Sequence, residues 1–280
     1  MTLAHLLDRW RGYAFPSRRW VVSAGARAFA LAGMAVDHQV LALVPTEHEA
    51  EELADDLGLF TRMILLPAWE TLPFEHISPN LATMAHRAQG RDQLRKAEVG
   101  TVVVASVRAA MQRISPSPPF PVTIKRGDEV SLPDLVHLLA ELGYERTDRV
   151  ESRGEFAVRG GIVDLFPAQA EDAVRIDLFG DTVEDLRQLS VGSQRSSDPL
   201  DQVRAYPARE FRPGPEVRKR ALGLLASDPW AASTWDRLAE GQMFSGMESW
   251  LPWLAEPRSL LDEVVEGTRV VLIDPARSRD

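Results

Sequence analysis

The sequence of 280 residues contains no cysteine, and this absence excludes several kinds of chemistry. Without thiols the chain has no disulfide framework, no thiolate zinc site and no cysteine nucleophile. The first residues, Met1 to Arg11, are interrupted by Asp8 and Arg9 and lack the apolar core of a secretory signal. We therefore expect a cytoplasmic protein.

Long apolar runs are also missing. The longest, Ala28 to Val36, is bounded by Arg27 and Asp37, whereas a bilayer-spanning helix needs about 20 apolar residues. The net charge is −9, from 41 acidic and 32 basic side chains. Non-specific binding to nucleic acid needs clustered lysine and arginine. We therefore expect no membrane segment, and nucleic-acid binding only if a local basic patch exists.

The first part of the chain has the pattern of a parallel α/β fold. With 45% hydrophobic and 26% charged residues the composition is that of a folded globular protein, and the length suggests about two domains. Short apolar runs alternate with helical patterns, which predicts a parallel sheet covered on both faces. We expect strands at residues 20–23, 39–44, 63–66 and 101–105, and helices at 26–35, 47–57, 82–96 and 107–114.

Two proline-rich joins divide the chain. Residues 115–121 contain four prolines, which interrupt both helices and central strands. The segment that follows predicts an α+β domain with a helix at 132–142 and mostly antiparallel strands at 156–166, 174–178 and 183–189. After the second join, Tyr206 to Pro215, come tryptophan-rich helices and an apolar strand, Arg269 to Asp274. We expect this strand to resume the first domain, and the chain to be a fragment of a longer protein.

A nucleotide-binding P-loop is absent where the fold would place it. The first predicted strand leads through Ser23, Ala24 and Gly25 into a helix, but the P-loop requires GxxxxGK[ST]. The only lysines are Lys96, Lys125 and Lys219, and none follows a glycine. We expect a plain strand-to-helix turn at a degenerate P-loop position, without hydrolysis of nucleotide. The six histidines form no HxxxH or HExxH motif, so no metal site is predicted either.

A group of arginines in the middle segment remains. Arg159 precedes Gly160 and Gly161, where the chain can turn tightly, and Phe179 beside Gly180 predicts an exposed aromatic anchor. Arginine with an aromatic residue is typical of a protein interface, and the guanidinium fork suits a partner's carboxylates. The alternative is that these arginines pair with the acidic residues beside them. The spaced arginines are Arg146, Arg149, Arg153, Arg159 and Arg175.

Several stretches resemble the bacterial transcription-repair coupling factor family, Mfd, and in part the excision-repair protein UvrB. The first is LPAWETLPFEHISP at residues 66–79. The second combines GEFAVRGGIVDLFP at 154–167 with RIDLFGD at 175–181, and further matches are GSQRS at 192–196 and GMESWLP at 246–252. UvrB has an intact P-loop and a tyrosine-rich β-hairpin, whereas this chain has no P-loop and three tyrosines. The resemblance therefore points to the UvrB-like N-terminal module of the coupling factors.

The resemblance implies a fold class and a domain division. It predicts α/β architecture: a degenerate RecA-like domain of the P-loop type, interrupted by an inserted α+β UvrA-binding domain. The expected first part of the RecA-like domain spans residues 1–122 and the inserted domain 123–212. Residues 213–280 would form the truncated second part of the RecA-like domain. The inserted segment contains 12 basic and 18 acidic residues, so its arginines must act by position rather than through a net positive charge.

The resemblance also implies partners. It predicts a UvrA-binding site formed by Arg159, Arg175 and Phe179, with Arg153 and Arg149 as a secondary interface. This fragment would recruit UvrA and use no cofactor, while the parent protein would use ATP and Mg²⁺ to move on double-stranded DNA and release stalled RNA polymerase. The alternatives are a UvrB-like DNA-binding fragment and a fragment that hydrolyses nucleotide.

Overall fold

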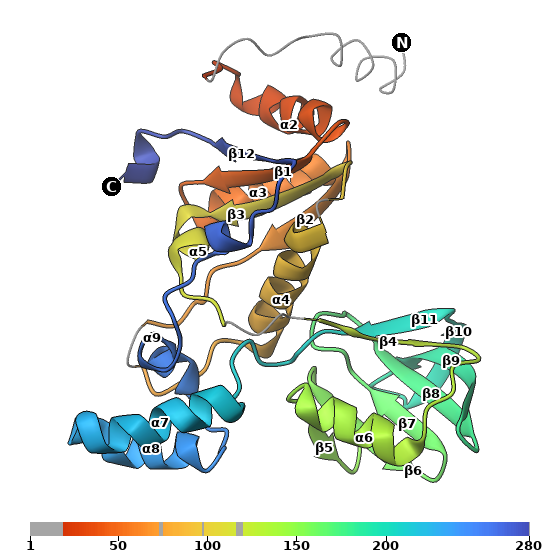
Figure 1. Ribbon diagram of the computed structural model, residues 1–280. Helices are drawn as coiled ribbons and strands as arrows, with labels where there is room; N and C mark the ends of the chain where they lie inside the picture. Colours follow the sequence, from red (N-terminus) through yellow and green to blue (C-terminus); the bar gives the residue numbers. More distant parts are fainter. Residues whose placement is uncertain (1–18, 73–74, 97, 116–119, 280) are drawn as a thin grey trace. The chain divides into compact units, whose positions relative to one another are not determined.

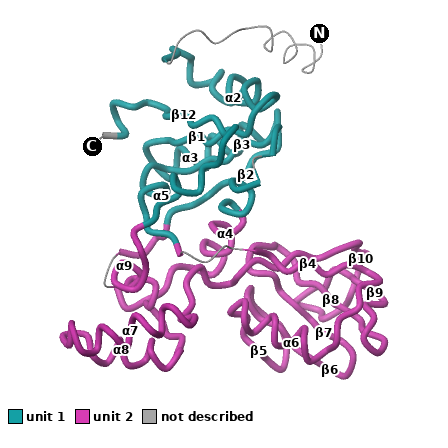
Figure 2. The backbone as a smooth tube through the Cα atoms, in the orientation of Figure 1, with its two compact units in different colours: residues 1–68, 90–114, 258–280 teal, residues 69–89, 115–257 magenta. Residues whose placement is uncertain are grey.

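The structure is a computed structural model that describes residues 19–72, 75–96, 98–115 and 120–279. The predictions for residues 1–11 and for most of the proline-rich stretch 115–121 fall outside these ranges. The chain divides into two compact units, each assembled from segments that are distant in sequence (Figure 2). Unit 1 comprises residues 1–68, 90–114 and 258–280, and unit 2 comprises 69–89 and 115–257. The domain boundaries predicted at residues 122 and 212 stay a prediction.

Unit 1 contains a parallel sheet of four strands in the order β12-β1-β3-β2 (Figure 1). Every residue of β1 and β3 is buried, which explains why both are continuous apolar runs. The strand from the end of the chain, β12, pairs with β1, as the sequence pattern predicts. The predicted α/β class is confirmed. The strands are β1 (Gln39–Val44), β2 (Arg62–Leu66), β3 (Thr101–Ser106) and β12 (Thr268–Leu272).

Helices cover both faces of this sheet. Val40 and Ala42 of β1 pack in one hydrophobic cluster with residues of α2 and α3, while Leu41 and Leu43 pack in another with Leu94 of α4 and residues of α5. Alternate residues of a strand point to opposite faces, so each of these strands contributes to two cores. The covering helices are α2 (Arg27–Ala35), α3 (Glu47–Gly58), α4 (Leu81–Lys96) and α5 (Val107–Met111). Residues 81–89 of α4 belong to unit 2 and 90–96 to unit 1.

The predicted strand at residues 20–23 is wrong. Residues 19–23 have no regular structure and lead into a short 3-10 helix, η1 (Ala24–Ala26). The physical reason lies in the pairing, because β3 and β12 already occupy the two edges of β1. In the described sheet the run pairs with neither outer strand, β12 or β2, and a short apolar run without a ladder does not become a strand, whatever its local propensity.

Unit 2 contains a sheet of six strands in the order β10-β9-β8-β7-β6-β5. Its ladders are antiparallel except for β5 with β6, which confirms the predicted mostly antiparallel arrangement. The apolar stretch 156–166 forms two strands that turn at Gly160, rather than one. The strands are β5 (Glu145–Thr147), β6 (Glu155–Arg159), β7 (Ile162–Leu165), β8 (Ala173–Phe179), β9 (Thr182–Ser190) and β10 (Arg195–Pro199). A separate ladder pairs β4 (Val122–Lys125) with β11 (Gln202–Ala205).

One face of the six-stranded sheet is covered by α6 (Leu132–Glu141). Ser131 caps this helix by accepting a hydrogen bond from the backbone N–H of Asp134. Leu135 and Leu139 pack in a cluster with Phe156 and other inward-facing strand residues. We call this the inner face of the sheet and the opposite one the outer face.

The rest of unit 2 is helical and contains the tryptophans. Trp235 is fully buried and Trp250 nearly so, within one cluster, while Trp230 is exposed and its ring centroid lies 5.6 Å from that of Trp250. Trp235 and Trp250 therefore contribute to the core of this helical part. The elements are α7 (Pro215–Ser227), η2 (Pro229–Ala231), α8 (Ala232–Ala239), η3 (Met247–Trp250) and α9 (Leu251–Leu254). In unit 1, η4 (Leu260–Glu263) and η5 (Arg277–Arg279) flank β12.

Candidate functional site

The outer face of the six-stranded sheet carries the residues that the sequence predicts for partner binding. Residues directly opposite each other in an antiparallel ladder point to the same face. Arg159 lies opposite Ile162, and Ile162 lies opposite Asp177. In the neighbouring row Asp164 lies opposite Arg175. The register therefore places Arg159 and Arg175 on one face, although they come from different hairpins.

Arg175 is held by a buried carboxylate. Its Nε donates to Oδ1 of Asp164 at 2.7 Å and its Nη2 donates to Oδ2 at 2.8 Å. The Asp164 side chain is 2% exposed and that of Arg175 is 18% exposed. The hydrogen bonds that Arg175 donates to Asp164 are the main reason why the pKa of Arg175 is raised above its ordinary value. A bidentate pair of this kind fixes the orientation of the guanidinium.

Sequence reasoning assigned no role to Asp164. The signal was present, because Asp164 is the one charged residue in the apolar run of β7, IVDL. An acidic residue at that point of an apolar strand faces away from the core and needs a partner. The antiparallel register with β8 shows that the partner is Arg175.

Arg159 is exposed at the end of β6, and its guanidinium forms a hydrogen bond with a backbone carbonyl of the same domain. Its Nη2 donates to the carbonyl oxygen of Asp148 at 3.0 Å. Among the described residues no carboxylate forms an ion pair with Arg159, in contrast to Arg175. This difference leaves the guanidinium charge of Arg159 available to a partner.

Phe179 ends β8 on the outer face and is 78% exposed. The following Gly180 has φ +62°, which lets β8 turn into β9 through a two-residue loop. Leu178 packs against the inner core, so strand alternation directs the Phe179 ring outward. An exposed phenylalanine of this kind has the character of an interface anchor.

The tips of two hairpins lie against each other near this aromatic ring. The backbone N–H of Leu178 donates to the carbonyl of Gly161 at 2.8 Å. A Cβ atom at Gly161 would lie 2.6 Å from the carbonyl oxygen of Leu178, so a side chain there would force the strands apart. Glycine at this position therefore brings the hairpin that carries Arg159 close to the one that carries Phe179.

The two secondary arginines are both paired. Arg153 forms an ion pair with Glu171 at 2.6 Å, and its guanidinium lies 6.0 Å from the centre of the Phe166 ring. Arg149 lies 3.7 Å from Glu151, an exposed pair of the kind that contributes little to stability. The alternative of surface pairing thus describes these two arginines better than it describes Arg159.

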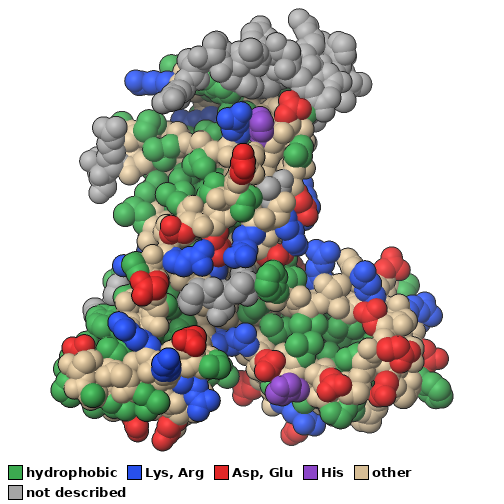
Figure 3. Space-filling view, viewed as in Figure 1, with side chains coloured by type: hydrophobic (Ala, Val, Ile, Leu, Met, Phe, Trp, Pro, Cys, Tyr) green, Lys and Arg blue, Asp and Glu red, His purple; other side chains and the backbone are tan. Residues whose placement is uncertain are grey.

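Acidic groups accompany the arginines on this face. Burial raises the pKa of Asp177, an effect that the nearby charge of Arg175 opposes and that of Asp185 reinforces. Asp185 itself pairs with Arg187 at 2.6 Å, and this hydrogen bond lowers the pKa of Asp185. Figure 3 shows acidic and basic side chains interspersed over the part of unit 2 that contains β8 and β9. This distribution suits a structured protein partner better than a phosphate backbone, which favours a continuous basic surface.

The degenerate P-loop position contains little that could hold a phosphate. Ser23, Ala24 and Gly25 are exposed, and the Ser23 side chain makes no capping hydrogen bond to η1. A Cβ atom on Gly25 would meet nothing within 4 Å. The three residues form an open turn, whereas a P-loop encloses phosphates with converging backbone N–H groups.

The motifs that carry the family resemblance outside the sheet are joined by buried polar contacts within unit 2. Trp69 donates from Nε1 to Glu210 at 2.8 Å, and Arg87 donates from Nε to the same carboxylate at 2.7 Å. Ser78 donates to Glu248 at 2.6 Å. These motifs therefore have a structural role in connecting the segment after β2 to the helical part of unit 2.

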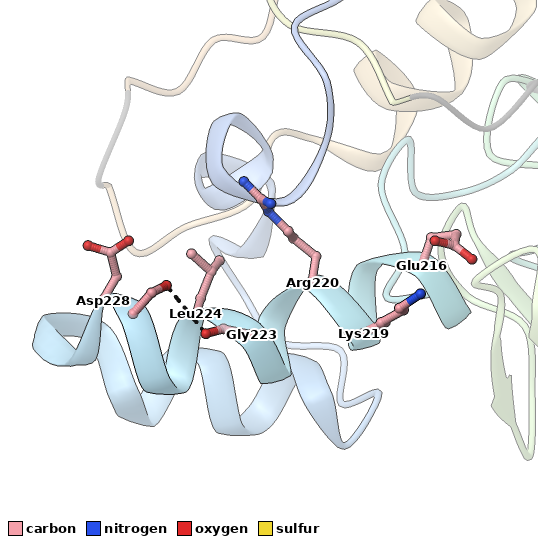
Figure 4. A pocket seen from close by; sticks show the side chains of 7 residues that line it. Glu216, Lys219, Arg220, Gly223, Leu224 and Asp228 are labelled. Atoms are coloured by element: carbon pink, nitrogen blue, oxygen red, sulfur yellow. Dashed lines mark hydrogen bonds between the residues drawn. The ribbon is translucent and has the colours of Figure 1, made fainter.

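A shallow hollow of about 460 Å³ runs along the exposed side of α7 (Figure 4). The Ser227 hydroxyl donates to the carbonyl of Gly223 at 3.3 Å in its wall. Charges of both signs project into it from a single helix, so it selects no particular ligand. The charged lining residues are Glu216, Lys219, Arg220 and Asp228.

The described residues contain neither a cluster of metal ligands nor a helix that could span a membrane. In these ranges no three His, Cys, Asp or Glu side chains gather closely enough to hold a metal ion. Across the same ranges every helix is too short or too polar to cross a bilayer.

Residues 122–211, which span β4 to β11, match the UvrB interaction domain. The chain therefore contains a UvrB interaction domain within a UvrB-like region. A 129-residue stretch is 32% identical to the UvrABC system protein B of Thermotoga maritima, covering 45% of this chain and 19% of that protein.

The chain is homologous to the N-terminal region of the transcription-repair coupling factors over about nine tenths of its length. It is 38% identical to the Mycobacterium bovis protein, covering 92% of this chain and 23% of that relative. Its identity to the Escherichia coli protein is 30%, covering 78% of this chain and 20% of that relative. The chain thus spans about a quarter of the length of these relatives.

Proposed function

We propose that this chain is the UvrA-recruiting module of a transcription-repair coupling factor. The observation that carries the proposal is the placement of Arg159, Arg175 and Phe179 together on the outer face of the domain that matches the UvrB interaction domain. The face combines an exposed aromatic anchor with guanidinium groups, a combination typical of protein interfaces. Arg153 and Arg149 form a secondary contact at its border.

The inserted domain is proposed to span residues 123–212. A degenerate RecA-like domain without ATPase activity is proposed to span residues 1–122 and 213–280. It would contain the parallel sheet of unit 1. In the longer parent protein, separate motor domains would bind ATP and Mg²⁺, translocate on double-stranded DNA and release stalled RNA polymerase at lesions. This module would then recruit UvrA for nucleotide excision repair.

The direct test is a titration of purified UvrA with the chain, followed by calorimetry. We expect a one-site complex that Arg159→Ala weakens by about 2 kcal/mol, or roughly thirtyfold. Lys219→Ala, a basic substitution on α7 away from the outer face, serves as the matched control and should leave the affinity unchanged. Equal affinities for all three proteins would refute the assignment of this face.

A second candidate is the UvrB-like reading, in which the fragment binds DNA or hydrolyses nucleotide. The similarity to UvrABC system protein B favours it. Binding to duplex DNA that weakens steeply with added salt would support it. We expect no mobility shift at moderate salt and no ATP turnover with or without DNA, because the P-loop lysine is missing.

A further inference from the structure

The two arginines of the proposed site differ in their electrostatic state. Arg175 is bound by Asp164 through two hydrogen bonds, so the pair carries no net charge. Arg159 donates to a backbone carbonyl, and no ion pair with a described carboxylate offsets its charge. The two residues share one face, about two strand spacings or 10 Å apart across the sheet and offset by two residues, about 7 Å, along it.

The geometry of the pair determines what Arg175 can still offer. Asp164 accepts from the Nε and Nη2 edge of the guanidinium. A guanidinium has five N–H donors, so Nη1 and the second hydrogen of Nη2 stay available for an end-on contact. The carboxylate lies beneath the sheet surface at 2% exposure, and it therefore holds the guanidinium from the protein side.

We propose that Asp164 is a positioning residue and that the two arginines contribute differently to the complex. Arg159 supplies net positive charge that attracts an acidic partner surface. Arg175 supplies an oriented hydrogen-bond donor that holds a partner carboxylate after contact, and Asp164 sets its orientation. This inference rests on the proposed function, with UvrA as the partner.

The two contributions affect different rate constants. Unpaired charges at an interface raise the association rate, and this effect weakens as ionic strength rises. Oriented, partly buried hydrogen bonds mainly slow dissociation. A neutral ion pair contributes little to long-range attraction because its two fields nearly cancel at a distance.

The experiment is stopped-flow association and dissociation of UvrA with the full chain at several ionic strengths. Arg159→Gln is expected to slow association and flatten its dependence on ionic strength. Asp164→Asn adds a positive charge, so association should become faster at low salt. Dissociation of this variant should nevertheless be about tenfold faster, because Arg175 is no longer oriented. Faster association with unchanged dissociation would overturn the positioning role.

A double-mutant cycle separates positioning from a general effect on folding. In an Arg175→Gln background, Asp164→Asn should change dissociation by less than about twofold, since nothing remains to orient. The double variant keeps the net charge of the native pair, so the dependence of its association rate on ionic strength should match the wild type. An equal effect of Asp164→Asn in both backgrounds would mean that the carboxylate is merely structural.

Two additional variants complete the design. Asp185→Asn breaks another arginine–aspartate pair on the same face, with Arg187, and should not accelerate dissociation tenfold. If Asp164→Asn does not fold, Asp164→Glu replaces it in the cycle, because it keeps the charge but displaces the carboxylate by one methylene. If the complex of Asp164→Glu with UvrA dissociates at the wild-type rate, the inference is overturned. Absence of any wild-type complex would refute the proposed function and this inference with it, whereas a complex without coupling in the cycle refutes the inference alone.

Discussion

The two larger sheets of this protein differ in how many of their faces are buried. In unit 1 the strands β1 and β3 are buried on both faces, and helices occupy the space where a ligand or partner would bind. In unit 2 the inner face of the six-stranded sheet packs against α6 while the outer face carries charged residues and Phe179. The difference explains why the candidate site is found on the second sheet.

This comparison gives each unit its own sensitivity to substitution. A strand buried on both faces has no position that can change without disturbing a core. A strand with one solvated face can vary its outward residues while its inward residues maintain the fold. Substitutions in unit 1 should therefore reduce stability, whereas substitutions on the outer face of unit 2 should affect binding.

The largest effect is expected in the parallel sheet. Leu41→Ala on one face of β1 should lower the free energy of unfolding of unit 1 by about 2 to 5 kcal/mol, because it leaves a cavity in a fully buried site. Ile162→Ala on the partly exposed outer face of unit 2 is the control and should cost less than about 1 kcal/mol. Urea unfolding followed by circular dichroism measures both. Similar losses of unfolding free energy in the two variants would show that Ile162 is packed as tightly as a core residue.

The next largest effect is a loss of affinity for the partner that leaves the stability of the fold unchanged. Phe179→Ala should weaken UvrA binding by about 2 kcal/mol while leaving the unfolding midpoint unchanged, since the ring is exposed before the partner arrives. Phe120 is another exposed aromatic residue in unit 2 but lies outside the outer face, so Phe120→Ala is the matched control. Equal losses of affinity for both variants would mean that general hydrophobicity, rather than this face, attracts the partner.

Much of the fold was predictable from local pattern. The continuous apolar runs at 39–44 and 101–105 predicted strands buried on both faces, and both strands formed. The strand expected at 20–23 did not form, because a strand depends on pairing with the sheet and this run pairs with none of the described strands. Local sequence contains no information about that competition.

The ion pair behind the site was not predicted, for a related reason. Asp164 and Arg175 are 11 residues apart and meet only once the register of β7 and β8 is fixed. From the sequence, the only pairing considered for these arginines, as the alternative to an interface, was with the acidic residues beside them in the chain. Arg149 does pair with Glu151 in this way, but in a sheet most side-chain partners lie across the strands.

A smaller effect should follow from a buried hydroxyl, that of Tyr144, which links segments of unit 2. Tyr144 donates to the carbonyl of Tyr206 at 2.9 Å and accepts from the backbone N–H of Ala168 at 3.1 Å. Burial raises the pKa of this phenol above its ordinary value. Tyr144→Phe should lower the free energy of unfolding by about 1 to 2 kcal/mol, because both backbone groups lose their partner. Ser227→Ala, which removes an exposed hydroxyl, should change it by less than about 0.5 kcal/mol. Equal changes would contradict the role of burial.

The smallest expected effect is on how the stability of the fold depends on pH, and it differs in sign between a residue of unit 2 and one of unit 1. The pKa of Asp177 is raised by burial, so ionisation is less favourable in the folded state than in the unfolded one. Stability from this group is present below its ordinary pKa and is lost as pH rises through the raised value. Asp177→Asn should therefore increase the unfolding midpoint of unit 2 slightly at neutral pH, with no gain in strong acid.

Asp262 in unit 1 provides the control of opposite sign. Hydrogen bonds from the backbone and side chain of Ser259 lower its pKa, so the stability it contributes is present at neutral pH and is lost as pH falls through the lowered value. Asp262→Asn should destabilise unit 1 at neutral pH, and the difference from wild type should shrink in acid. Urea midpoints between pH 3 and pH 7 measure both variants. The same sign for both would contradict the opposite pKa shifts of Asp177, which burial raises, and Asp262, which hydrogen bonds from Ser259 lower.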